Sequence, residues 1–526
     1  MGPYYVIIIP ALGGIVVGFL TTTFAREAKG HGVPEVMLAV ARSGGRIRFR
    51  VSAVKALASS ICIGSGGSVG REGPIVQIAS SLGSGLGQLF RLDEDKIRVL
   101  VACGAAAGVA ATFNAPIAGT FFALEVILRK YSQRFFSAIV LSSMIATLIS
   151  RHHLGDRPAF VTPVYQFNSL WELLFYLIFG FIAAFLGLAF IKLLYGSEDL
   201  FDSLKIPEII KPAIGGVLIG AIGFCYPQIF GVGYEAIDLA LFGKISLIIG
   251  ITLVFLKIVA TSLTLGSGGS GGIFAPSLFI GAMAGEAYGK LTYLVAPAMA
   301  IPPGACALVG MAAVFAGAAQ APFTAVLILF EMTGDYRIIL PLMITCIIST
   351  LVVRKLSSES IYTLKLKRRG IDIDRVIEQD MMEHHTVAEA MIENPATLND
   401  SDALDKAEAL IEFSGHYGFP VLDSTGKLVG VLASHDILEA HKRAFSDESR
   451  RAVLVREIMT SSILVCYPDE KLHDVLDKMG ERNIDHIPVV ERNDTSRLVG
   501  LITGKNVIAL YHRFCNIEDQ DSIKER

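Results

Sequence analysis

The sequence predicts a polytopic all-α membrane domain of two related halves, followed by a smaller soluble α/β module. Of the 526 residues, 52% are hydrophobic and the mean hydropathy is +0.55, which is too apolar for a wholly soluble chain. Apolar segments interrupted by glycine and proline recur in two halves, about 1–150 and 170–365. After about residue 370 charged residues become frequent, so we place the membrane domain at 1–369 and the soluble module at 370–526.

The first apolar run extends from Tyr4 to Leu20 and has no basic segment before it. Because a convincing small-residue cleavage site is also missing, we expect a retained membrane helix rather than a signal peptide. Many later apolar segments are shorter than the roughly 20 residues that cross a bilayer upright. Tilted or half-crossing helices are therefore expected.

A glycine-rich turn with one acidic residue, Glu72, precedes the apolar segment 75–90, and its sequence from Gly64 is Gly-Ser-Gly-Gly-Ser-Val-Gly-Arg-Glu-Gly-Pro. Proline suits the first position of a helix, so Pro74 predicts a helix whose free amides face Glu72. Helix N-termini attract anions, and irregular backbone persists inside a membrane only where it is buried or lines a wet cavity. The turn therefore predicts a membrane-embedded anion site. A structural ion pair between Glu72 and Arg71 is the alternative.

The same turn returns in the second half of the chain. Residues 266–270 repeat the sequence of residues 64–68, and Pro276 follows Pro74 by 202 residues. Paired broken helices in corresponding halves indicate a transport site at the interface between the repeats. Three further pairs support the repeat: the turns at 30–34 and 231–235, Pro116 with Pro322, and Glu125 with Glu331. Because Glu125 and Glu331 are repeat partners, we expect both to be structural.

Two basic groups and the cysteines complete the membrane domain. Basic residues tend to lie on the cytoplasmic side, although a merely solvated charge run is the alternative. The cysteines show no metal-type spacing, so we predict no metal site and expect small buried side chains. The basic groups are Arg42, Arg46, Arg48 and Arg50, and Lys365, Lys367, Arg368 and Arg369; the cysteines are Cys62, Cys103, Cys225, Cys306, Cys346, Cys466 and Cys515.

The soluble module is itself a tandem repeat, with units at about 386–441 and 454–512. Phe-Pro-Val at 419–421 returns as Ile-Pro-Val at 487–489, and Leu-Val-Gly at 428–430 returns at 498–500. Each unit is predicted to contain a helix, a strand with Pro-Val, a strand with Leu-Val-Gly, and a helix beginning near Ser434 or Gly504.

Together these motifs resemble the CLC family of chloride channels and chloride/proton exchangers, followed by a pair of CBS domains. Gly-Arg-Glu-Gly-Pro at 70–74 and Gly-Gly-Ile-Phe-Ala-Pro at 271–276 match that family's most specific motifs. The turn at 30–34 approximates a third motif, and Tyr362 falls where the family has an ion-facing tyrosine. The resemblance covers nearly the whole chain. It implies a homodimer in the lipid bilayer, two inverted halves around one anion pathway per subunit, and a chain that begins at the family's third helix.

By this resemblance, a chloride or similar anion would be held by the amides of Ile273 and Phe274, the phenol of Tyr362, and the turn formed by His31 and Gly32. Backbone amides and one hydroxyl can replace the water of chloride without holding it too tightly. Glu72 would act as the gate, because its ionised carboxylate would occupy an anion position and its protonated form would swing away. His31 stands where the family commonly has serine. It either faces the ion or is turned aside and held by a backbone carbonyl.

Val126 occupies the position at which exchangers carry an inner proton-relay glutamate. Valine cannot carry a proton, so we expect uncoupled or weakly proton-coupled, channel-like chloride movement. A chloride/proton antiporter is the alternative, since some exchangers lack that acid. Fluoride specialists depart from the family pattern at the position of Pro74, which favours chloride here.

In the soluble module, Ser434 and Asp436 resemble the CBS nucleotide pattern, in which the hydroxyl lies near the phosphates and the carboxylate binds the ribose. Thr503 and Asn506 are the second copy, with asparagine in place of the usual aspartate. ATP, ADP or AMP is the candidate ligand, and a purely structural pair that braces the dimer is the alternative. We expect no obligatory cofactor and no nucleic-acid partner, and we expect this module to be cytoplasmic.

Enzyme functions are disfavoured by context. Residues 266–271 fit the spacing of a dinucleotide-binding loop, but no βαβ unit surrounds them and no phosphate-loop lysine follows. A serine hydrolase would need a histidine partner for Ser267 or Ser270, and none is repeat-related. A non-conducting membrane nucleotide sensor is a remote alternative, because it would leave Glu72 and both glycine turns without a use.

Overall fold

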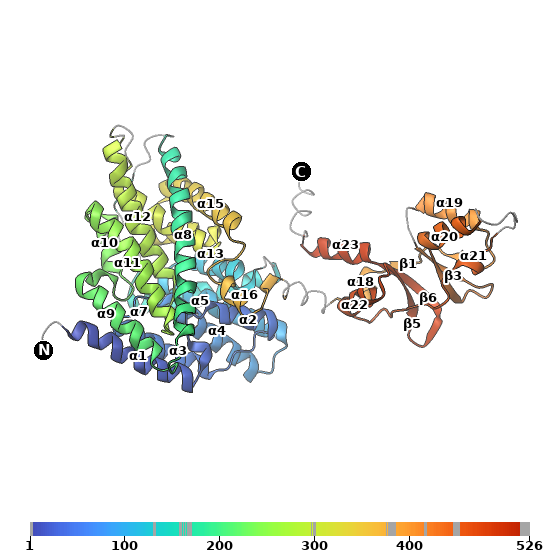
Figure 1. The fold of residues 1–526 in the computed structure, drawn as a ribbon, viewed down its shortest axis with the longest axis horizontal. Coiled ribbons are helices and arrows are strands. Elements are labelled where there is room, and N and C mark those ends of the chain that lie inside the picture. Colours follow the sequence, from blue (N-terminus) through green and yellow to red (C-terminus); the bar gives the residue numbers. More distant parts are fainter. Residues whose placement is uncertain are drawn as a thin grey trace. The chain divides into compact units, whose positions relative to one another are not determined.

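The computed structural model describes residues 4–129, 133–156, 160, 163, 165, 171–295, 297, 301–374, 376, 385–414, 418–444 and 453–515. The chain forms two compact units, Met1–Ile373 and Asp374–Arg526 (Figure 1). The division lies a few residues after the change in composition near residue 370.

The described part of the first unit is built of helices. Six of them are long and apolar enough to cross a membrane, whereas α2, α6 and α10, with 10, 7 and 8 residues, are too short to do so. In order the helices are α1 (Tyr5–Thr23), α2 (Val33–Arg42), α3 (Arg50–Gly64), α4 (Glu72–Leu89), α5 (Glu94–Phe113), α6 (Pro116–Phe122), α7 (Gln133–Leu154), α8 (Glu172–Ser203), α9 (Lys211–Cys225), α10 (Tyr234–Leu241), α11 (Leu247–Gly266), α12 (Phe274–Val295), α13 (Pro303–Ala319), α14 (Pro322–Thr333), α15 (Ile339–Leu356) and α16 (Thr363–Arg368).

The sequence repeat corresponds to a repeat of helices. Helices α1 to α7 match α9 to α15 in order, and α8 links the two series (Figure 1). Within each half the long central helices pack in the same way, α4 on α5 and α12 on α13. Across the halves α1 packs on α9, where Gly14 lies against the backbone of Pro212 and Gly216 lies against that of Pro10. The two halves therefore share an extensive and symmetric interface.

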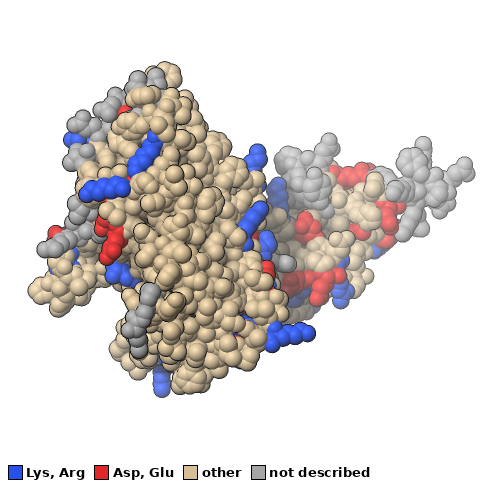
Figure 2. Space-filling view, turned by 60° about the vertical axis from the view of Figure 1, so that its left-hand side comes forward, with Lys and Arg blue, Asp and Glu red and all other residues tan. Residues whose placement is uncertain are grey.

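The outer surface of the first unit is strongly apolar. The face shown in Figure 2 consists mostly of uncharged residues. Many large hydrophobic side chains are exposed on long helices, which suits contact with lipid, and examples are Ile8, Leu12, Leu148, Phe185, Ile248, Phe255 and Leu351. Cys62, Cys103, Cys306 and Cys346 are buried as expected, but Cys225 is exposed at the end of α9, contrary to the expectation of burial.

The second unit contains two small sheets, and the predicted Pro-Val and Leu-Val-Gly strands are present in both. One sheet has the order β2-β3-β4 and the other β1-β6-β5. The strands are β1 (Ile392–Glu393), β2 (Leu398–Asn399), β3 (Gly418–Leu422), β4 (Leu428–Ala433), β5 (His486–Glu491) and β6 (Asp494–Thr503); the helices are α18 (Val387–Ala390), α19 (Leu404–Ser414), α20 (Ser434–Ala444), α21 (Val455–Ile458), α22 (Leu472–Arg482) and α23 (Gly504–Cys515).

The two sequence repeats exchange their first elements. Strand β1 pairs with β6, and Val387 of α18 belongs to the hydrophobic core that contains Val489. Val455 of α21 in turn belongs to the core that contains Val421. Each repeat therefore completes the core of the other, which the sequence units at 386–441 and 454–512 did not anticipate.

Candidate anion-binding site

The glycine-rich turns of the two halves meet and bond to each other. The Gly70 amide donates to the Gly272 carbonyl at 2.8 Å, and the Gly272 amide donates to the Gly70 carbonyl at 2.6 Å. The Gly30 turn joins them, since its amide donates to the Gly269 carbonyl at 3.0 Å. A Cβ atom at Gly272 would lie 2.7 Å from the Gly73 nitrogen, so this approach requires glycine.

Helices α4 and α12 begin beside these turns, each two residues earlier than the prolines predicted. They start at Glu72 and Phe274, and the prolines lie within the first turn, where amides have no partner inside the helix. Glu72 is itself the first residue of α4, so its own amide belongs to the helix N-terminus that was expected to face its side chain. Its Oε2 and the Ala275 amide at the start of α12 both lie against Gly70. The carboxylate is thus placed at the N-terminus of the helix from the other half.

A small cavity lies between these helix starts. The space open to the centre of a water-sized sphere is about 10 Å³, which is roughly the room that one water needs. Each of the predicted site residues that line it is at most 3% exposed, and Gly32 stands at positive φ just before α2. The lining residues are His31, Val33, Glu72, Gly73, Val76, Val109, Phe122, Ile273, Phe274 and Tyr362.

Glu72 is held by a tyrosine that the sequence analysis missed. The Tyr234 hydroxyl donates to Glu72 Oε1 at 2.7 Å, while Glu72 Oε2 is buried without a hydrogen-bond partner. The guanidinium of Arg71 lies 5.7 Å from the centre of the Tyr234 ring, and no ion pair in the described part of the chain joins it to Glu72. Tyr234 follows the cavity residue Val33 by 201 residues, but the two residues differ, so the repeat did not mark it.

His31 is not held by a backbone carbonyl, which was one of the two arrangements considered for it. It lines the cavity, but its Nε2 lies 3.4 Å from the Tyr195 hydroxyl on α8 rather than on a backbone carbonyl. Its Nδ1 is buried without a partner, and its ring centre is 5.9 Å from that of Tyr362. Nδ1 and Glu72 Oε2 are therefore both left unsatisfied at one small cavity.

Two buried lysines hold the turns in place, and they occupy repeat-related positions. Lys55 donates to the carbonyls of Ala28 and Gly30 at 3.0 and 2.7 Å. Lys257 donates to those of Ile229 and Gly231 at 3.0 and 2.9 Å. Both lysines are 0% exposed. The first places its Nζ beside the turn that carries His31.

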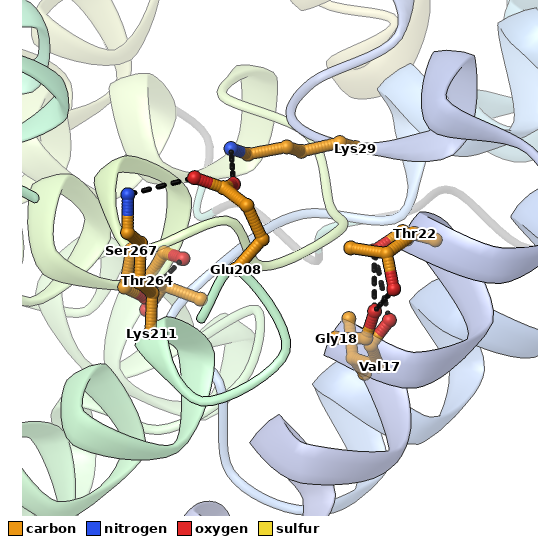
Figure 3. A network of polar contacts seen from close by, with 9 residues as sticks. Val17, Gly18, Thr22, Lys29, Glu208, Lys211, Thr264 and Ser267 are labelled. Atoms are coloured by element: carbon orange, nitrogen blue, oxygen red, sulfur yellow. Dashed lines mark hydrogen bonds and ion pairs between the residues drawn. The ribbon is translucent and has the colours of Figure 1, made fainter. Parts of the chain in front are cut away.

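A further ion-pair network links the halves near the same turn. Glu208, in the segment before α9, lies between two lysines in Figure 3. It binds Lys29 at 2.9 Å and Lys211 at 2.7 Å. Lys29 directly precedes Gly30. The network therefore connects the residue before the Gly30 turn to the second half of the chain. Through these hydrogen bonds, mainly the one from Lys211, the pKa of Glu208 lies below its usual value.

The repeat-related acids Glu125 and Glu331 each cap the N-terminus of a helix in the opposite half of the chain. Glu331 accepts from the amides of Ile117 and Ala118 at 3.0 and 2.7 Å, at the start of α6. Glu125 accepts from the Thr324 amide and hydroxyl at 2.8 and 2.6 Å, at the start of α14. This reciprocal arrangement agrees with the structural role expected for both.

A larger vestibule adjoins the cavity. On the same measure its volume is about 360 Å³. Tyr362 borders both spaces, and Val126 lines only the vestibule. Arg129 and Arg354 line it together with Glu125, so two basic side chains and one acidic side chain border this space.

The predicted nucleotide residues lie at the starts of α20 and α23. Asp436 Oδ2 accepts from the Ala433 amide at 2.9 Å, and Ser434 is the first residue of α20. The Thr503 hydroxyl bonds to the Asn506 side chain at the start of α23. Among the residues that the structure describes, no cluster of histidine, cysteine and acidic side chains could hold a metal ion.

Comparison with known proteins places this geometry in context. The family described as "Voltage gated chloride channel" matches residues 13–354, and the CBS domain family matches residues 387–443 and 455–513. A putative ClcB-like chloride channel protein of Ralstonia nicotianae is 33% identical over 70% of this chain and 87% of its own length. The H⁺/Cl⁻ exchange transporter ClcA of Vibrio parahaemolyticus is 34% identical over 72% of this chain and 82% of its own.

A solved structure shares the fold. The crystal structure of a slow cyanobacterial Cl⁻/H⁺ antiporter superposes with a TM-score of 0.64 at 26% identity, over 70% of this chain and 88% of that protein. The two repeat halves and the broken helices at their interface thus belong to a known transporter architecture.

Proposed function

Since this chain belongs to the voltage-gated chloride channel (CLC) family, with a C-terminal pair of CBS domains, we propose that it exchanges chloride for protons through the cavity beside Glu72. The observation that carries the proposal is the placement of the Glu72 carboxylate at the start of α12, in a cavity that it shares with Ile273, Phe274 and Tyr362. A carboxylate at that position competes with an anion for the same helix N-terminus. Protonation removes the competing charge.

Two features bear on the choice between exchange and channel-like conduction. Val126 favours the channel-like expectation, because no carboxyl group stands at that position of the vestibule. The exchangers among the similar proteins favour the coupled alternative. Glu72 is also buried with one oxygen unpaired, which suits a group that binds and releases protons. We therefore adopt coupled exchange as the proposal.

The test uses the purified full-length chain in liposomes. An outward chloride gradient is expected to drive proton uptake at a fixed ratio, and a proton gradient is expected to shift the chloride reversal potential. Glu72→Ala is expected to abolish the proton movement while chloride still passes. Chloride flux without proton movement in the unaltered chain would favour the channel-like alternative. Absence of any anion flux would refute transport and leave the non-conducting nucleotide sensor.

Two further parts of the proposal follow from the family. We propose that the chain is a homodimer with one pathway per subunit, and that the CBS unit lies in the cytoplasm. Mass measurement of the detergent-solubilised protein tests the dimer. Protease accessibility of the CBS unit in right-side-out and inverted vesicles tests its side, since cleavage only in inverted vesicles is expected.

A second proposed function is adenine nucleotide binding at the CBS pair. Ser434 and Asp436 stand together where β4 enters α20, and we expect weaker binding at the second site, where Asn506 replaces the usual aspartate. Equilibrium dialysis with radiolabelled ATP and AMP, on the full-length chain and on Asp436→Ala, tests this. No binding to either chain would support the purely structural alternative, and equal binding to both would show that the nucleotide does not depend on Asp436.

A further inference from the structure

His31 is a titratable side chain that lines the cavity, and the proposed exchange assigns no proton to it. It is 3% exposed, lines the same cavity as Glu72, and has Nδ1 buried without a partner. Leaving a buried polar atom unpaired costs about 1–3 kcal/mol of folding free energy. The fold bears this cost at Nδ1, which leaves the nitrogen free to bind a ligand. A transient ligand of the cavity would satisfy it.

The neighbours of the ring determine which nitrogen carries the proton. The Tyr195 hydroxyl donates to the Ile361 carbonyl at 2.5 Å, so its proton is already used. Only its lone pairs face His31 Nε2 at 3.4 Å, which favours a proton on Nε2. In the neutral ring Nδ1 then carries a bare lone pair. A bare lone pair repels chloride, whereas a protonated Nδ1 donates to it.

The charges around His31 oppose a proton unless an anion is present. Lys55 and Lys365 lie behind the Gly30 turn, and Arg369, a few residues after Lys365, forms an ion pair with Glu35 at 2.7 Å. Across the cavity stand the Glu72 carboxylate and the phenol of Tyr362, and Tyr195 completes the surroundings. Burial of the ring and the basic groups behind it disfavour a positive charge on His31, and a chloride in the cavity offsets both.

We propose that His31 takes up a proton at Nδ1 together with chloride and passes it to Glu72, so that it supplies the proton step that Val126 cannot. The inference rests on the proposed exchange and deepens it. An N–H bond forms at Nδ1 with a proton from the aqueous vestibule. That bond breaks as an O–H bond forms at Glu72 Oε2, the other unpaired atom of the cavity. Glu72 is then neutral, and the imidazole returns to its original state.

The first experiment measures chloride binding by calorimetry in detergent, in a Glu72→Gln background that removes the proton of the gate. Linkage to one proton makes the chloride affinity rise as the pH falls, by up to tenfold per pH unit. Proton uptake per bound chloride, obtained from buffers of different ionisation enthalpy, is expected to approach one. Both effects are expected to vanish in Glu72→Gln/His31→Ser. The control is His153→Ser, which removes an exposed imidazole at the end of α7.

The second variant is Tyr195→Phe, which removes the acceptor at Nε2 and leaves His31 in place. The neutral ring can then carry its single N–H proton on Nδ1. From there it donates to chloride without taking up a second proton. Proton uptake per chloride is expected to fall at least twofold although the histidine is intact. A purely structural role of Tyr195 would leave this ratio unchanged, which would contradict the proposal.

The third experiment measures the proton-to-chloride ratio in liposomes. His31→Ser is expected to lose proton movement, and His31→Ser/Val126→Glu is expected to regain it, because the second substitution supplies a carboxyl group at the vestibule. If His31→Ser exchanges protons at the original ratio, or if chloride binding to Glu72→Gln is independent of pH, the inference is wrong while the proposed exchange stands. Absence of chloride flux in the unaltered chain would instead refute the proposed function. Glu72→Ala replaces Glu72→Gln should the latter not fold.

Discussion

Tyr234 holds the Glu72 carboxylate, the proposed gate, in its present position through a hydrogen bond at 2.7 Å. A hydrogen bond from a hydroxyl to a carboxylate contributes about 1.5–3 kcal/mol and favours the ionised form. Tyr234→Phe is therefore expected to let Glu72 protonate more readily. We predict that the pH at half-maximal chloride efflux from liposomes rises by about one unit.

Tyr288→Phe is the matched control for that prediction. It removes a hydroxyl that donates to the Phe175 carbonyl at 2.9 Å in the same half of the chain, away from Glu72. Its efflux profile is expected to keep the original midpoint. Equal midpoints for both variants and the unaltered chain would show that Tyr234 does not restrain the gate.

The polar partners of the site could not be predicted from the sequence, although the site itself could. Repeat-related glycines and prolines located the turns, because close backbone contact leaves few choices of residue. Tyr234 corresponds to Val33, so a search for matching residues passes over it. Tyr195 lies on α8, outside every motif. It is 164 residues from His31 in the sequence, and the tertiary structure alone brings the two side chains together. Such contacts depend on tertiary structure and leave no local pattern.

At the scale of elements, Glu125 and Glu331 make equivalent caps but have unequal surroundings, because only Glu125 lines the vestibule. If both acids are structural, Glu125→Gln and Glu331→Gln should lower stability by similar amounts, about 1–2 kcal/mol each. Thermal unfolding in detergent measures this, with the exposed Glu94→Gln as control. Loss of proton coupling in Glu125→Gln alone would show a functional role that the caps do not explain.

The turns of the β3–β4 and β5–β6 hairpins depend on ionised aspartates. Asp423 Oδ1 accepts from the Thr425 hydroxyl and amide, both at 2.7 Å, and Asp494 binds Ser496 in the same way. These hydrogen bonds, first that of the Thr425 hydroxyl, lower the pKa of Asp423, and those of Ser496 lower that of Asp494. A lowered carboxyl pKa gives stability that is present above the unfolded value and is lost as the pH falls through the folded one.

We therefore predict that hydrogen-exchange protection of Leu428–Ala433 declines below about pH 4. Asp423→Asn should reduce the protection at neutral pH and remove most of its dependence on pH, since the amide cannot ionise. Asp405→Asn, an exposed change on α19, is the control. Unchanged pH dependence in Asp423→Asn would contradict the assignment.

At the scale of the whole CBS unit, the exchange of first elements predicts that a substitution in one sequence repeat destabilises the core of the other. Val387 and Val455 are both 0% exposed, and each lies in the core of the other repeat. Val387→Ala should destabilise by about 1–2 kcal/mol and raise hydrogen exchange in β5 and β6. Val455→Ala should instead raise exchange in β3 and β4. The opposite assignment would mean that each repeat folds on its own elements.

The repeat predicted two related halves in the membrane unit, because the glycine and proline motifs of the first half return in the second. It could not predict the exchange in the CBS unit. Val-x-Glu in α18 and α21 is compatible with either core, since both cores accept a valine of the same size. Only the pairing of β1 with β6 decides between them.

The cross-half contacts of the turns have a consequence for biogenesis. Ser68 bonds to the Ile229 carbonyl and Ser270 to the Ala28 carbonyl, as Gly70 bonds to Gly272. When only the first half has been synthesised and inserted, the polar groups of its glycine-rich turn lack these partners, and the membrane interior offers no water in their place. The proposed anion-binding site can therefore form only after the later helices are inserted. Until then, a nascent first half is expected to require a membrane chaperone.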